Sequence, residues 1–193
     1  MLLTGTEDIR VQKTIESIHS AFTSLLLEVP YGRITVKELC ERARINKKTF
    51  YRYYGALDDL LAEIQEMYSR PYAERTAGMR YPQDVEAVTR DFLLYSAEQG
   101  ELYDRIVCSS DYENILKNVL FGMEDDRYTI STPPQGWTDA DWSLYMAHVT
   151  SAQMRIYRQW VEDGKKVPVE RMVEIACKLI CQGAEKPALP HAL

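Results

Sequence analysis

A run of cationic and aromatic residues in the first third of the chain carries side chains suited to binding another molecule. Positive charges and hydroxyl groups occur together within seven residues, on Lys47, Lys48, Thr49, Tyr51, Arg52 and Tyr53. Lysine and arginine bind phosphate oxygens and the acceptor atoms of guanine, and the hydroxyl groups of threonine and tyrosine bind phosphates. The chemistry that this pattern indicates is contact with double-stranded DNA.

Two short helices have to position these side chains. Thr35 and Glu38 have the spacing of a capping box, which starts a helix whose apolar face is Val36, Leu39, Cys40 and Ala43. The pattern breaks at residues 44–46, and Asn46 is a suitable N-cap for a second helix that runs from Lys47 to about Tyr54. Phe50 and Tyr54, four residues apart, are expected to point into the core. Thr35 and Lys37, at the start of the first helix, are further candidates for DNA contact.

A longer helix before this pair supplies its support. Apolar residues recur every three or four positions between Ile9 and Glu28, in the order Val11, Ile15, Ile18, Phe22, Leu25 and Leu26. The stripe predicts one buried face, and three helices of this size form a compact helix-turn-helix unit.

These residues resemble the DNA-binding domain of the TetR/AcrR family of bacterial transcriptional regulators. The resemblance runs from about Ile9 to Tyr68 and includes the segments Gly32 to Ala43, Thr49 to Tyr54 and Leu60 to Ile64. It implies a one-component regulator, most often a repressor, that binds a palindromic operator as a homodimer and responds to a small-molecule effector.

Two positions depart from the pattern of that family. The family usually has glycine in the turn where this chain has Arg44, so Arg44 is expected to adopt a left-handed backbone conformation at a cost of about 1 kcal/mol. The family also often has a phosphate-binding lysine where this chain has Leu57, which predicts the loss of one contact with the DNA backbone.

The remainder of the chain also has helical patterns. Further helices are expected from Leu57 to about Ala73, Gln83 to Gln99, Glu101 to Ser109, Asp111 to Met123, Thr138 to Asp163, and Pro168 onward, with a loop over 124–136. The fold class is therefore all-α with about nine helices. Residues 1–55 are expected to form the DNA-binding domain and residues 56–193 a helical domain for effector binding and dimerisation.

Six residues of the second domain are candidates to line an apolar effector site: Phe92, Tyr95, Tyr103, Cys108, Met123 and Trp137. Aromatic residues at helical spacing are also common in an ordinary core, and that alternative stays open. The layout of the later helices is similar to a branch of the family that includes regulators of dihydroxyacetone kinase operons, in which the partner can be a protein.

The last two helices have broad apolar faces and are expected to form an antiparallel hairpin. Two such hairpins, one from each chain, make a four-helix dimer interface. The candidate interface residues are Tyr145, Met146, Val149, Ile156, Met172, Val173, Ala176 and Ile180. The alternative is that the same stripes complete the core of a single chain.

The charge is distributed unevenly along the chain. The formal net charge of the 193 residues is −6, yet residues 1–55 hold nine Lys and Arg against six Asp and Glu. The positive end is expected to attract DNA and the acidic remainder to face away from it. The acidic total, with Arg44 and Leu57, also motivates an alternative function: a protein-interaction module of the same fold with weakened DNA binding.

Motifs of other functional classes are absent from the sequence. It has no nucleophile elbow, no phosphate-binding glycine loop and no His-Glu-x-x-His segment, so we expect no enzyme, no catalytic residues, no metal site and no cofactor. The four scattered cysteines indicate neither a disulfide framework nor a zinc site. Neither a signal peptide nor a membrane-spanning run is evident, so a cytoplasmic protein without membrane contact is expected.

Overall fold

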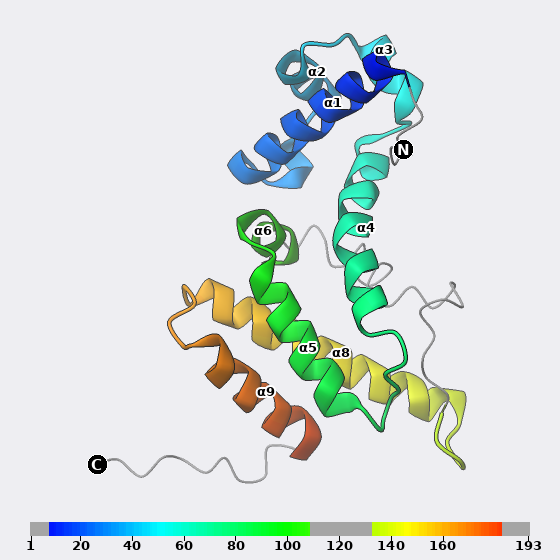
Figure 1. Ribbon diagram of the computed structural model, residues 1–193, viewed down its shortest axis with the longest axis vertical. Coiled ribbons are helices and arrows are strands. Elements are labelled where there is room, and N and C mark those ends of the chain that lie inside the picture. Colours follow the sequence, from blue (N-terminus) through cyan, green and yellow to red (C-terminus); the bar gives the residue numbers. More distant parts are fainter. Residues whose placement is uncertain (1–7, 109–132, 183–193) are drawn as a thin grey trace. The chain divides into compact units, whose positions relative to one another are not determined.

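The structure, a computed structural model, describes residues 8–108 and 133–182 (Figure 1). Over these residues the chain forms eight α-helices, one short 3-10 helix and no strand, which confirms the predicted all-α class. The helix expected at 111–123 and most of the loop expected at 124–136 lie outside the described residues.

The helices follow the predicted pattern closely. Their bounds are α1 Ile9–Glu28, η1 Tyr31–Arg33, α2 Val36–Ala43, α3 Lys47–Tyr53, α4 Leu57–Arg75, α5 Val85–Glu98, α6 Glu101–Cys108, α8 Asp139–Glu162 and α9 Val169–Gln182. The ends lie within about two residues of those expected from apolar periodicity and capping residues. Gly164, with φ of 75°, follows the end of α8, and the carbonyl of Pro168 accepts hydrogen bonds from the first turn of α9.

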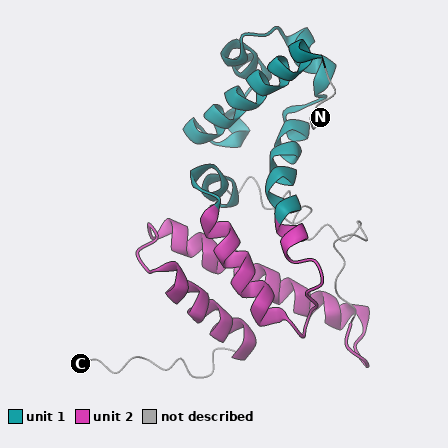
Figure 2. Ribbon diagram, viewed as in Figure 1, with its two compact units in different colours: residues 1–71, 99–124 teal, residues 72–98, 125–193 magenta. Residues whose placement is uncertain are grey.

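The chain divides into two compact units (Figure 2). The first comprises residues 1–71 and 99–124, and the second comprises residues 72–98 and 125–193. Helix α4 begins in the first unit and ends in the second, and the boundary falls directly after Pro71, a proline inside the helix. The functional boundary expected after residue 55 stays a prediction.

The first unit has a core centred on α1. This helix packs against α2 and α6, and α2 packs against α3. The buried apolar side chains of α1 to α3 are Ile15, Ile18, Ala21, Phe22, Leu25, Leu26, Leu39, Cys40, Ala43 and Phe50, and Tyr54 follows them. The predicted stripe on α1 is therefore the face on which the two short helices rest.

The second unit has α5 packed against both α8 and α9, which also pack against each other. Its core contains two buried polar contacts besides apolar side chains. The Nε2 atom of Gln153 on α8 donates to Oγ1 of Thr89 on α5 over 2.8 Å, and the Tyr157 hydroxyl donates to the carbonyl of Ser96 over 2.8 Å. These bonds satisfy polar groups in the interior and fix the register of α8 against α5.

The Gln153–Thr89 contact gives a prediction about the stability of the second unit. Thr89→Val keeps the shape of the side chain but removes the acceptor for the buried amide of Gln153, and should lower the free energy of unfolding by about 1 to 3 kcal/mol. Thr150→Val is the matched control, because the Thr150 hydroxyl bonds the carbonyl of Met146 within its own helix. In chemical denaturation, Thr150→Val should lose less than half as much unfolding free energy as Thr89→Val. Equal losses would contradict a stabilising role of the hydrogen bond between α8 and α5.

Candidate nucleic-acid interface

Side chains at both helix starts hold the two-helix unit as predicted. Oγ1 of Thr35 accepts from the backbone N–H of Glu38 over 3.2 Å, and the Glu38 carboxylate accepts from the backbone N–H of Thr35 over 3.0 Å. Oδ1 of Asn46 accepts from the backbone N–H of Thr49 over 2.8 Å. The capping box at α2 and the N-cap at α3 are both confirmed, and they fix where each helix starts.

Helix α3 has an inner and an outer face. Phe50 and Tyr54 are buried, with 0% and 2% of their surface exposed, and their rings lie 5.8 Å apart. Lys47, Lys48 and Arg52 are exposed, and Thr49 and Tyr53 are half-buried. Tyr51 is 55% exposed, although an apolar ring normally gains by burial. The burial pattern therefore leaves the candidate DNA-binding side chains on the outside of a helix that is anchored by two aromatic rings.

The turn between α2 and α3 has the left-handed residue that the sequence predicted. Arg44 has φ of 55° and ψ of 40°. Its N–H donates to the carbonyl of Glu41 over 3.2 Å, and the N–H of Ile45 donates to the carbonyl of Cys40 over 3.0 Å. This arrangement ends α2 with a side chain other than glycine at the left-handed position.

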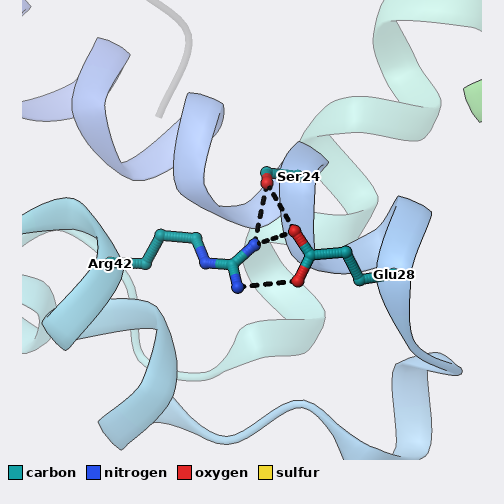
Figure 3. Close-up of polar contacts among 3 residues, drawn as sticks. All are labelled: Ser24, Glu28 and Arg42. Atoms are coloured by element: carbon teal, nitrogen blue, oxygen red, sulfur yellow. Dashed lines mark hydrogen bonds and ion pairs between the residues drawn. The ribbon is translucent and has the colours of Figure 1, made fainter.

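An exposed ion pair fastens α2 to α1 (Figure 3). Nη1 and Nη2 of Arg42 lie 2.5 and 2.7 Å from the two carboxylate oxygens of Glu28, and Nη1 also donates to the Ser24 hydroxyl over 2.8 Å. The bond to Arg42 lowers the pKa of Glu28 and raises the pKa of Arg42. The two-pronged contact of Arg42 with the end of α1 was not predicted from the sequence.

A polar network joins the end of α3 to α1 and α4. The Tyr54 hydroxyl donates to Oε2 of Glu63 over 2.7 Å, and Nε2 of His19 lies 3.0 Å from the Tyr54 hydroxyl and 3.1 Å from the same carboxylate oxygen. Burial lowers the pKa of His19, which favours the neutral imidazole. The same cause raises the pKa of Tyr54 to about 12. The sequence contained a signal for this network, since Glu63 lies on the apolar stripe of α4 beside Leu60 and Ile64.

The cations of the two-helix unit differ in their partners. Arg42 is paired with Glu28, and Nζ of Lys37 lies 3.9 Å from the carboxylate of Glu41. No acidic residue occurs between Arg42 and Leu57 in the sequence. The guanidinium of Arg52 lies 5.9 Å from the centre of the Tyr53 ring, a contact that leaves the charge uncompensated. The uncompensated positive charge is thus concentrated on the turn and α3.

The residues expected to line an effector site fall in both units. Phe92 and Tyr95 are buried on α5, and the ring of Tyr72 lies 5.9 and 5.4 Å from theirs. Tyr103 and Cys108 lie on α6 in the first unit, where the Tyr103 ring is 5.2 Å from that of Tyr68. Trp137 is 43% exposed and contacts Trp142 and Tyr145, and Met123 lies outside the described residues. Tyr72 and Tyr68 were not among the expected lining residues.

The expected interface residues also fall in two groups. Val149, Met172, Val173 and Ala176 are buried in the core of the single chain, as in the alternative considered for these stripes, whereas Tyr145, Met146, Ile156 and Ile180 are half-buried. Three other apolar residues are exposed on the hairpin helices: Leu144, Ile175 and Leu179. Periodicity indicated which faces are apolar but did not distinguish the face used by the chain's own core.

Comparison with known proteins agrees with this geometry. Residues 18–64, which include α2, α3 and most of α1, match the family model of the bacterial regulatory proteins of the tetR family. No curated protein sequence matches the chain. The fold is similar to that of the fatty acid degradation regulator FadR from Bacillus halodurans, with a TM-score of 0.57 and 13% identity over 90% of this chain and 97% of that one.

Two further solved structures are similar. FadR from Bacillus subtilis, solved in complex with stearoyl-CoA, has a TM-score of 0.57 and 15% identity over 88% of this chain and 99% of that one. The dihydroxyacetone kinase operon activator DhaS has a TM-score of 0.45 and 22% identity over 87% and 94% of the two chains.

The two capped helices, the buried aromatic anchors and the cationic outer face define a helix-turn-helix protein that binds DNA. Over residues 18–64, which form this helix-turn-helix, the chain is similar to the bacterial regulatory proteins of the tetR family. Among the described residues, no helix is both long enough and apolar enough to cross a membrane.

The Tyr54 network gives a prediction about the pH dependence of stability. Tyr54→Phe should cost about 1 to 3 kcal/mol of unfolding free energy near pH 7, because the buried Glu63 carboxylate loses a donor. An unfolded tyrosine ionises near pH 10, whereas Tyr54 keeps its proton to about pH 12. The folded state then binds more protons than the unfolded state, so this contribution to stability falls as the pH rises above 10.

The measurement is denaturant unfolding of both proteins at several alkaline pH values. The stability difference between wild type and Tyr54→Phe should narrow between pH 10 and pH 12, since the variant has no phenol to ionise at this position. Tyr53→Phe, which changes a half-buried neighbour, is the control and should track the wild type. A difference that stays constant to pH 12 would refute the buried network.

Proposed function

We propose that this chain is a repressor that binds a palindromic operator as a homodimer through α3 and is released by a small-molecule effector. The observation that carries the proposal is the outer face of α3, where Lys47, Lys48 and Arg52 are exposed in a stretch without acidic residues, opposite the buried Phe50 and Tyr54. Uncompensated cations destabilise a folded protein through mutual repulsion, and a polyanionic partner removes that cost.

The dimensions of α3 suit the major groove. Its seven residues extend about 10 Å at about 1.5 Å per residue, and the groove is about 12 Å wide. Lys48 and Arg52 are four residues apart and lie on the same side of the helix. In this arrangement the lysine and arginine side chains contact guanine or phosphate, the hydroxyls of Thr49, Tyr51 and Tyr53 contact phosphates, and Thr35 and Lys37 contact the backbone from the start of α2.

The proposed dimer uses the hairpin of α8 and α9. Since Met172, Val173 and Ala176 are occupied by contacts within the chain, the surface available to a second copy includes the exposed Ile175 and Leu179. A twofold axis would repeat this surface on both copies and place two α3 helices one turn of DNA apart. Such spacing requires a palindromic operator.

The proposed effector site lies in the helical part after residue 55. Tyr72, Phe92 and Tyr95 form an aromatic cluster there, within the second unit. Because FadR from Bacillus subtilis was solved with stearoyl-CoA, that compound is a rational first probe for release of the duplex.

The test of DNA binding uses an operator selected from random duplexes by the purified protein. Lys48→Ala and Arg52→Ala should each weaken operator binding by about 1 to 3 kcal/mol and leave the helical content unchanged. Lys178→Ala is the matched control, because it removes one cation from α9, where Glu174 pairs with it. Fluorescence anisotropy should give a wild-type dissociation constant for the control. If both α3 variants bind the operator as tightly as the wild type, α3 is not the DNA-binding surface. If the wild-type protein binds no duplex even at low salt, the protein-interaction alternative is favoured.

The dimer surface has its own test. Leu179→Glu places a charge on an exposed apolar position of α9, and sedimentation should show a shift from dimer to monomer because a charge is costly to bury in an interface. Gln182→Glu adds the same charge at the exposed end of that helix and should remain dimeric. Circular dichroism should be unchanged in both variants. A dimer that persists in Leu179→Glu would place the interface elsewhere.

A further inference from the structure

The turn residue Arg44 combines an unfavourable backbone conformation with a side chain that has no partner. Its φ of 55° lies in the left-handed region, where a residue with a Cβ atom is strained and glycine is not. The side chain is exposed, and its guanidinium makes no hydrogen bond, ion pair or ring contact with any described residue. Strain of this kind is a signal of function when the surrounding fold gains nothing from the side chain.

Two other cationic residues of the chain, Lys165 and Arg42, differ from Arg44 in having partners within the fold. Lys165 is the other non-glycine residue with positive φ among the described residues, and its Nζ lies 5.2 Å from the centre of the Trp160 ring. Arg42, two residues before Arg44, forms a two-pronged pair with Glu28. Both side chains therefore contribute contacts within the fold, whereas the charge of Arg44 is left uncompensated, next to Lys47 and Lys48.

The position of Arg44 relative to α3 limits what it can reach. Only two residues lie between it and Lys47, the first residue of α3, so their Cα atoms lie at most about 10 Å apart. The major groove is about 12 Å wide and is bordered by phosphates on both sides. When α3 occupies the groove, the turn therefore has to lie near one of these rows of phosphates.

We propose that Arg44 binds a phosphate of the DNA backbone and extends the DNA-contacting surface from α3 onto the α2–α3 turn. The inference rests on the proposed function, since it requires α3 to occupy a duplex. A guanidinium is the group suited to the task, because its planar fork can donate to two phosphate oxygens at once. The contact is independent of base sequence.

The experiment separates the cost to the fold from the contribution to binding. Arg44→Gly relieves the backbone strain, so its melting temperature should rise by about 2 to 4 °C, while it loses the phosphate contact. Each phosphate contact contributes about 0.9 to the magnitude of the slope of log affinity against log salt. A contact that adds nothing at about 1 M salt therefore adds about eightfold to the affinity at about 0.1 M, and its removal loses that factor. Arg44→Gly should show that loss and the smaller slope on the selected operator.

Three further variants serve as controls. Arg44→Gln keeps the strain and removes the charge, so it should lose affinity at an unchanged melting temperature. Arg44→Lys should keep most of the affinity and the full salt slope. Lys165→Gly removes a cation and the same left-handed strain from the turn after α8, and should bind the operator within about twofold of wild type, because it changes no phosphate contact.

The outcomes distinguish this inference from the proposed function. Arg44→Gly and Arg44→Gln with wild-type affinity and slope would overturn the phosphate contact while leaving the role of α3 intact. A loss of affinity that is the same at every salt concentration would also overturn it, because a phosphate contact has to weaken with salt. A wild-type protein that binds no duplex would instead refute the proposed function.

Discussion

Helix α3 is too short to hold its own orientation, and the rest of the first unit depends on how it is anchored. A helix of seven residues is unstable in isolation, because nucleation fixes several residues for each hydrogen bond gained. The anchors are Phe50 and Tyr54, which are buried on the same side, and the Asn46 cap that fixes its start. The hydroxyl of Tyr54 bonds Glu63 on α4 and lies beside His19 on α1. The orientation of the outer face therefore depends on the inner one.

The cations of the first unit fall into two groups, paired and unpaired. Arg42 is used inside the fold, where it holds α2 against the end of α1 through Glu28 and Ser24. The charges on α3 and the turn are left without acidic partners. A protein selected only for stability would pair or remove them, since like charges at close range repel. A polyanion bound at this face explains both arrangements, and the strained Arg44 fits the same account.

The sequence was sufficient for features that depend on local spacing. The stripe from Ile15 to Leu26, the capping box at Thr35, the inward rings of α3 and the left-handed Arg44 all follow from residues within one or two helical turns of each other. Contacts between distant residues were not predictable in the same way. The pairing of Arg42 with Glu28 requires the crossing of α1 and α2 to be known, and a lone Glu63 on an apolar stripe suggests a buried carboxylate without identifying its partners.

The apolar stripes of α8 and α9 show a second limit of sequence patterns. Periodicity identified Met172, Val173 and Ala176 as members of one face, but a core within the chain and an interface between chains favour the same residues. The packing of α9 against α5 shows that these three side chains are covered within the chain. The exposed Ile175 and Leu179 became visible only once that packing was known, and they direct attention to a different side of the hairpin.

The outer face of α3 is the surface that we propose binds the major groove of duplex DNA. Methylation interference tests it most directly, because methylation of guanine N7 blocks the major groove and methylation of adenine N3 blocks the minor groove. Guanine N7 methylation should prevent binding at two clusters about 10 base pairs apart, related by the symmetry of the operator. Binding that tolerates guanine methylation everywhere and is blocked only by adenine N3 methylation would contradict it.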